Sequence, residues 1–134
     1  MNQLLEQLKD IVGPKGWVSD VDELEPHVNE WRGVFTGVTP LMVMPASTSE
    51  VSQVVAACAK AGVGIVPQGG NTGMCAAAIP DDSGDQVLLS MARMNRIRSI
   101  DADNFSMEVD AGCVLQTIQE AALAAGCYFP LSLG

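Results

Sequence analysis

The stretch Pro67-Gln68-Gly69-Gly70-Asn71-Thr72-Gly73-Met74 decides how this 134-residue chain is organised. It follows the apolar run Val63-Gly64-Ile65-Val66, which predicts a buried strand, and it places three glycines within five residues. Glycine is favoured where the backbone takes a positive φ or where another group approaches the main chain closely. A loop of this kind at the end of a strand points N–H groups outward and predicts an anion-binding concavity.

The loop is free of positive charge, because no lysine or arginine occurs between Lys60 and Arg93. Backbone N–H groups and neutral side chains would therefore have to hold an anion here. Many directed donors suit a diphosphate better than free inorganic phosphate. The residues alone leave a second interpretation open, a tight and empty connection between two strands.

Composition narrows the class of protein. The chain is 48% hydrophobic, which excludes a disordered chain and is enough for one domain with a modest core. A net charge of -9 argues against nucleic acid and favours a generic acidic surface. We find no apolar run of membrane-spanning length and no hydrophobic signal core at the start, so we expect a cytoplasmic protein.

Cysteine and histidine usage predicts no metal site. The single histidine is His27, expected as a surface or packed residue with nothing nearby to orient it, and no two cysteines have CxxC spacing. We expect reduced thiols in apolar surroundings, with a redox role for the loop residue Cys75 as a minor alternative. The cysteines are Cys58, Cys75, Cys113 and Cys127.

Two helices are expected before the first strand of the core. Apolar residues at helical spacing predict a helix over 1–12, ended by Gly13-Pro14, and a short helix follows over 20–27. The next segment, 30–39, contains Trp31-Arg32-Gly33. Either it is a loop anchored by a packed tryptophan, or it lies over a ligand.

A βαβ unit leads into the glycine loop. A short strand over 41–44 is followed by Ser47 and Glu50, a capping box, and then by an apolar helix face that Gly62 ends. The next strand, over 64–67, is therefore expected to be parallel to the first, with a right-handed crossover. The loop leaves its C-terminal end, where open α/β sheets place their ligands.

The pattern changes after residue 90. A third buried strand over 86–90 is followed by alternating segments over 96–100 and 105–111, which predict a hairpin, and by a helix over 114–125. The fold predicted is α+β, with N-terminal helices, a small parallel lobe over 41–90 and the start of a second lobe over 95–134. A hairpin and one helix make a marginal sheet, so the second lobe is expected to be incomplete and the chain to be part of a longer protein.

Six segments of the chain together carry a resemblance to a known family. They are Trp31-Arg32-Gly33, Pro45 with Glu50-Val51, Val66 to Gly73, Leu89 to Ile97, Glu108 to Gly112 and Pro130 to Gly134. They resemble the PCMH-type FAD-binding domain of the vanillyl-alcohol-oxidase flavoproteins. Within that family the chain is most similar to the enzymes that oxidise D-lactate, D-2-hydroxyglutarate and glycolate.

The resemblance implies FAD as cofactor, with backbone N–H groups of the loop around its diphosphate. Binding would be non-covalent, because Asn71 stands where some relatives carry a flavin-linked histidine. The implied cofactor-binding residues are Pro67, Gln68, Gly69, Gly70, Asn71, Thr72, Gly73, Met74, Ala111, Gly112, Ser132, Leu133 and Gly134.

The resemblance also implies that the full-length enzyme oxidises a small 2-hydroxy acid and passes electrons to a quinone or an electron-transfer protein. The family's catalytic histidines would follow Gly134, so this chain is expected to hold no catalytic residue and to be inactive alone. Two departures stand out: Ala76-Ala77 replaces a glycine pair and is expected to make that part of the loop less open, and Ser132 replaces an acid.

A different class of function stays open beside this one. The chain would then be a non-catalytic nucleotide-binding or self-associating module, forming a homo-oligomer through an exposed sheet edge. A Rossmann NAD protein is excluded, because the glycines lead into Ala76 to Pro80 and not into an amphipathic helix.

Overall fold

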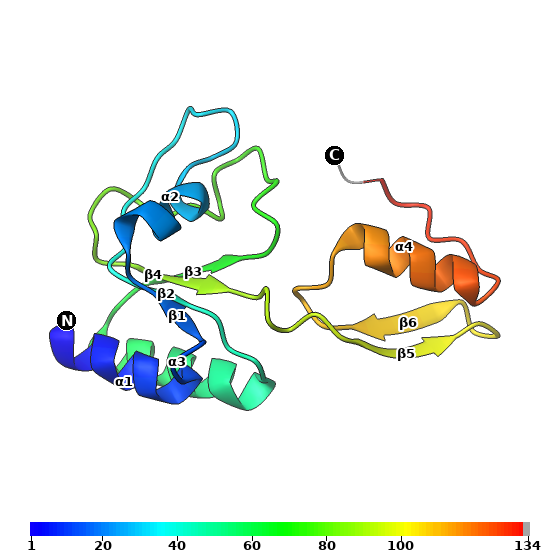
Figure 1. The fold of residues 1–134 in the computed structure, drawn as a ribbon, viewed down its shortest axis with the longest axis horizontal. Helices are drawn as coiled ribbons and strands as arrows, with labels where there is room; N and C mark the ends of the chain where they lie inside the picture. Colours follow the sequence, from blue (N-terminus) through cyan, green and yellow to red (C-terminus); the bar gives the residue numbers. More distant parts are fainter. Residues whose placement is uncertain (133–134) are drawn as a thin grey trace.

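The computed structural model describes residues 1–132, and within them the chain forms two lobes (Figure 1). The first lobe holds a four-stranded sheet in the order β1-β2-β4-β3. Its strands are β1 (Trp17–Val18), β2 (Met42–Val43), β3 (Ile65–Gln68) and β4 (Val87–Ser90). β2 and β3 are each parallel to β4, which lies between them, and β1 is antiparallel to β2.

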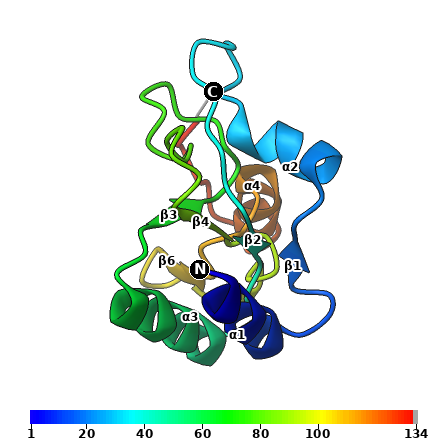
Figure 2. The same cartoon turned by 90° about the vertical axis from the view of Figure 1, so that its left-hand side faces the viewer.

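Helices cover both faces of this sheet. α1 (Asn2–Val12) and α3 (Thr48–Ala61) lie side by side on one face, and α2 (Val21–Val28) lies on the other (Figure 2). Val43, Val87 and Leu89 belong to the core beneath α1 and α3, whereas Met42, Val66 and Leu88 pack with Leu24 of α2. Successive side chains of a strand point to opposite faces of the sheet, and helices cover both faces here. All four residues of β4 are therefore buried.

Local sequence signals fix the ends of α3 and α2. The hydroxyl oxygen of Ser47 accepts the N–H of Glu50 at 3.2 Å, and the Glu50 carboxylate accepts the N–H of Ala46 at 2.8 Å. The predicted capping box therefore forms, with its second bond one residue before the N-cap. Gly62 ends α3 with φ 67°, and Asp20 caps α2 through two N–H groups.

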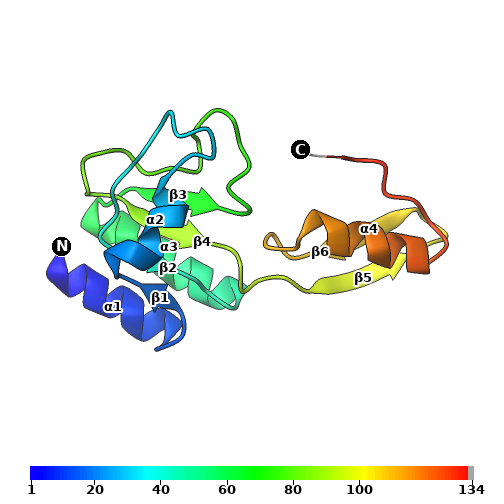
Figure 3. The ribbon, with the colours of Figure 1, turned by 45° about the horizontal axis from the view of Figure 1, so that its top comes forward.

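The second lobe is an antiparallel hairpin with one helix against it (Figure 3). β5 (Ile97–Asp101) pairs with β6 (Ser106–Val109), with an irregularity between Ile97 and Ser99, and α4 (Leu115–Ala124) follows. Ala122 is the buried residue of α4, while Leu115, Ile118 and Ala125 are half-buried. Phe105 is 87% exposed. The predicted α+β class, with an antiparallel hairpin and one helix in the second lobe, is confirmed.

The structure differs from the sequence predictions in two places within this framework. β1 was not predicted, because two residues are too few to show a period. Cys58 is buried as expected, but Cys75 is exposed, so the expectation of apolar surroundings is wrong for Cys75. None of the helices described in residues 1–132 is long and apolar enough to cross a membrane.

Candidate functional site

A cavity of about 510 Å³ lies where the two lobes meet. Its wall comes from the glycine loop after β3, from the connector after β4, and from the turn after β6 together with the start of α4. No charged side chain is among the described residues that line it. These are Gly69, Gly70, Thr72, Ala92, Asn95, Ala111, Gly112, Cys113, Val114 and Leu115.

The main-chain donors of the glycine loop are available. Among residues 1–132, none of the N–H groups from Gly69 to Met74 donates to a protein acceptor. The donors of the loop are therefore unpaired within the described residues. Across the cavity α4 begins at Leu115, and its N-cap Val114 makes no side-chain hydrogen bond to it. A helix N-terminus carries free N–H groups and a partial positive charge, so both walls favour an anion.

The loop glycines are not required by the protein's own packing. A Cβ atom added at Gly69 or Gly73 would meet no atom within 4 Å, and one at Gly70 would meet only the methyl group of Thr72 at 3.9 Å. Positive φ does not explain them either, because none of the three adopts it. Close approach of another group to the main chain is the explanation that fits.

Positive φ occurs instead at two other residues of this loop. Asn71 has φ 53° and Ala76 has φ 54°. Ala76 therefore takes a positive φ in spite of its Cβ atom, and the expectation that Ala76-Ala77 makes this part of the loop less open stays a prediction. The alanine adopts the left-handed region in which its Cβ is unfavourable by about 1–2 kcal/mol.

Gln68 supports the base of the loop. Its side-chain nitrogen donates to the carbonyl oxygens of His27 at 2.8 Å and Ala78 at 2.9 Å. The amide oxygen of Gln68 lies 3.0 Å from Nδ1 of His27 and can only accept, so Nδ1 carries a hydrogen and donates this hydrogen bond. The expectation that nothing orients His27 is wrong.

The remaining predicted cofactor residues separate into two groups. Gly69, Gly70, Thr72, Ala111 and Gly112 are brought together in the cavity wall. The other described residues do not line it: the Gln68 and Asn71 side chains bond to protein carbonyls, and Pro67, Gly73, Met74 and Ser132 are exposed. Leu133 and Gly134 lie outside the described residues.

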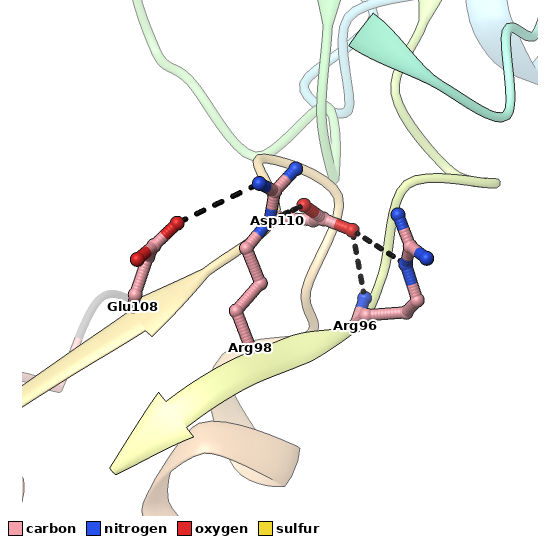
Figure 4. A network of polar contacts seen from close by, with 4 residues as sticks. All are labelled: Arg96, Arg98, Glu108 and Asp110. Carbon is pink, nitrogen blue, oxygen red and sulfur yellow. Dashed lines mark hydrogen bonds and ion pairs between the residues drawn. The ribbon is translucent and has the colours of Figure 1, made fainter. Parts of the chain in front are cut away.

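A buried carboxylate secures the turn at the opposite wall (Figure 4). Asp110 accepts from Nε of Arg98 at 2.6 Å and from the backbone N–H and Nε of Arg96 at 3.3 and 3.2 Å. The hydrogen bond from Arg98 is the main reason that the pKa of Asp110 lies below its ordinary value. This network fixes the end of β6 immediately before Ala111 and Gly112.

Sequence reasoning missed the other half of the cavity wall. Asn95 was part of a family segment but was not chosen as a site residue, Cys113 was treated only as a reduced thiol, and Val114 and Leu115 only as a helix start. The helix start directly after Ala111-Gly112 was the available signal. The packed-tryptophan interpretation of segment 30–39 is wrong, because Trp31 is 64% exposed.

Comparison with known protein families shows which family this domain belongs to. Residues 39–134 match the family described as the FAD binding domain. The chain belongs to this family. The predicted resemblance and the FAD cofactor are thereby confirmed for this FAD-binding domain, and the neutral, donor-rich cavity fits the diphosphate of such a cofactor.

Curated relatives share most of this domain. A mitochondrial D-2-hydroxyglutarate dehydrogenase of Arabidopsis thaliana is 35% identical over 126 residues, which is 94% of this chain and 22% of the relative. A putative mitochondrial D-lactate dehydrogenase of Schizosaccharomyces pombe is 29% identical over 98% of this chain and 26% of the relative. The chain therefore spans about a quarter of the length of these proteins.

Solved structures share the fold at lower identity. An alkyldihydroxyacetonephosphate synthase matches 94% of this chain and 25% of its own, with a TM-score of 0.81 at 23% identity. A p-cresol methylhydroxylase matches 99% of this chain and 26% of its own, with a TM-score of 0.76 at 18% identity. The two-lobed arrangement is thus a fold that these solved structures share.

Proposed function

We propose that this chain is the N-terminal FAD-binding portion of a flavin-dependent oxidoreductase that oxidises a small 2-hydroxy acid. The observation that carries the proposal is the cavity whose glycine-loop wall presents unbonded main-chain N–H groups. The names of the relatives, D-2-hydroxyglutarate and D-lactate dehydrogenase, support this substrate class. Glycolate is a further member of the same class.

Each wall of the cavity has a role in this proposal. The N–H groups of Gly69, Gly70 and Thr72 would donate to the diphosphate oxygens, while the first turn of α4 faces them with its positive end. Gly112 and Ala111 would line the cofactor without side-chain bulk. FAD, when bound, supplies the acceptor for the hydride of the 2-hydroxy acid. Asn71 has no nucleophile to offer, so we propose that attachment is non-covalent.

We propose that this portion alone is catalytically silent. Its one histidine, His27, is bonded to Gln68 beneath the glycine loop and does not line the cavity. Substrate-binding groups and the contacts to an electron-accepting protein or quinone would come from the remainder of the parent protein. The cytoplasmic location expected from the sequence stays a prediction.

The decisive experiment is FAD titration of the purified chain, followed by flavin fluorescence. We expect measurable binding by the original chain and at least about a tenfold loss in Gly69→Ala, because the new methyl group occupies space that the protein leaves free at the cavity wall. Urea unfolding of Gly69→Ala should be unchanged within about 0.5 kcal/mol.

Gly73→Ala serves as the matched comparison. It adds the same methyl group in the same loop, also without a protein neighbour, at a residue that does not line the cavity. We expect a smaller loss of affinity than in Gly69→Ala. Equal FAD affinity in all three proteins, or no FAD binding by the original chain, would refute the proposal.

One observation favours a second function, self-association. Within the described residues the β5–β6 sheet has only two strands, so each of them has one edge free to pair with a strand of another molecule. Phe105 and Tyr128 are exposed beside this sheet. A stable dimer in size-exclusion chromatography without FAD, together with no FAD binding, would support a self-associating module over the flavin-binding portion.

A further inference from the structure

We infer that Arg32 is a positioning residue for the cofactor loop, an inference that rests on the proposed function. Arg32 lies in the segment between α2 and β2, 42 residues before Met74 in the chain. One of its terminal nitrogens donates to the main-chain carbonyl of Met74 at 2.6 Å, at the far end of the glycine loop. Arg32 itself does not line the cavity.

Buried Glu30 fixes the direction of this arginine. The Glu30 side chain is 1% exposed, and one of its oxygens lies 2.5 Å from Nε of Arg32. The other oxygen accepts the backbone N–H of Arg32 at 3.2 Å. A buried carboxylate with both oxygens bonded holds the guanidinium in one orientation, and it also cancels the positive charge. Arg32 therefore acts on the loop as a directed donor and not as an attractant for phosphate.

The same short segment, which we call the 27–32 brace, holds the glycine loop at three points. His27 bonds to Gln68 at the start of the loop. The carbonyl of Asn29 accepts from the Asn71 side chain at 3.0 Å in the middle of the loop. Arg32 bonds to Met74 at its end. The brace thus replaces the internal hydrogen bonds that the loop lacks.

This bracing explains how the loop keeps its N–H groups free. A glycine-rich segment without internal bonds has many accessible conformations, and ordering each residue on binding opposes affinity by about 1–2 kcal/mol. A loop held in place before the ligand arrives avoids part of that loss. Side chains and main-chain carbonyls of the brace bond only to side-chain and carbonyl groups of the loop, and so leave the main-chain donors for the diphosphate.

The test combines FAD affinity with loop mobility in the 134-residue chain. We expect Arg32→Ala to raise the FAD dissociation constant about tenfold, as for loss of a hydrogen bond to a charged group. Arg32→Lys keeps a positive charge beside Glu30 but lacks the guanidinium that bonds to Glu30 and Met74 together. Its FAD dissociation constant should therefore lie between those of the original chain and Arg32→Ala. Lys60→Ala removes an equal charge at the end of α3, away from the cavity and the brace, and should bind like the original chain.

Loop mobility separates positioning from general stability. In the unliganded chain, NMR order parameters for the amides of residues 69–74 should fall in Arg32→Ala to below about 0.6, with those of β3 and β4 unchanged. Unchanged order parameters, or a looser loop with unchanged FAD affinity, would overturn the inference. If Arg32→Ala does not fold, Arg32→Lys gives the same two measurements. A chain that binds no FAD refutes the proposed function, whereas the order parameters still test the brace.

Discussion

Gly112→Ala tests whether the turn that closes the cavity depends on close backbone packing. A Cβ atom at this residue would lie 1.9 Å from the carbonyl oxygen of Met91 and 2.8 Å from that of Met94. Main-chain atoms cannot rotate away as a flexible side chain can, so the turn must move by about 1 Å. That movement breaks the hydrogen bond from the Gly112 N–H to the Met94 carbonyl, now 2.8 Å long.

The expected destabilisation follows from these contacts. Overpacking contributes about 1–3 kcal/mol and the lost hydrogen bond about 1 kcal/mol, while the stiffer unfolded chain returns about 0.5 kcal/mol. We therefore expect the free energy of unfolding to fall by about 2–3 kcal/mol and the melting temperature by about 10 °C. Urea and thermal unfolding followed by circular dichroism measure both.

Gly73→Ala is the control, because its new Cβ meets no atom within 4 Å and its φ is not positive. Its unfolding free energy should stay within about 0.5 kcal/mol of the original. A Gly112→Ala protein that unfolds together with this control, within about 2 °C, would refute the claim that backbone contact requires glycine at that turn.

Three further substitutions test local features. Ala76→Gly should raise the free energy of unfolding in urea by about 0.5–1 kcal/mol, since glycine accepts φ 54° without strain; a loss would contradict this. Hydrogen bonds lower the pKa of Asp110, so its contribution is present above the ordinary value of about 3.9 and is lost as pH falls through the depressed pKa. Asp110→Asn should therefore flatten the acid limb of the stability–pH curve, and an unchanged limb would count against the Arg98 contact. Ser47→Ala should lower the melting temperature through a cap loss of about 1 kcal/mol, whereas Ser49→Ala should not.

The sequence was most informative where a local rule decides the structure. The helix over 48–61 could be predicted closely, because Ser47, Glu50 and Gly62 mark its ends through bonds to their near neighbours. The glycine loop could be placed after a buried strand for the same reason.

Other parts of the site depend on contacts between distant residues. The Arg32–Met74 bond joins residues 42 positions apart, and no periodicity or motif predicts which carbonyl an arginine reaches. Gly112 was chosen through family resemblance, but its packing against Met91 became evident only from the structure. Exposure of Trp31 could not be predicted either, because an aromatic residue in a loop is compatible with both burial and exposure.

The position of β4 in the sheet has a consequence for the synthesis of the chain. β2 and β3 do not pair with each other, and each pairs with β4. The sheet therefore cannot join β2 to β3 until residues 87–90 have left the ribosome. Strands that lie this far apart in the sequence pair late and slowly, because the loop of chain between them must close first. Nascent chains that stop before Val87 should therefore remain protease-sensitive and depend on chaperones, whereas chains that extend past Ser90 acquire a protected first lobe.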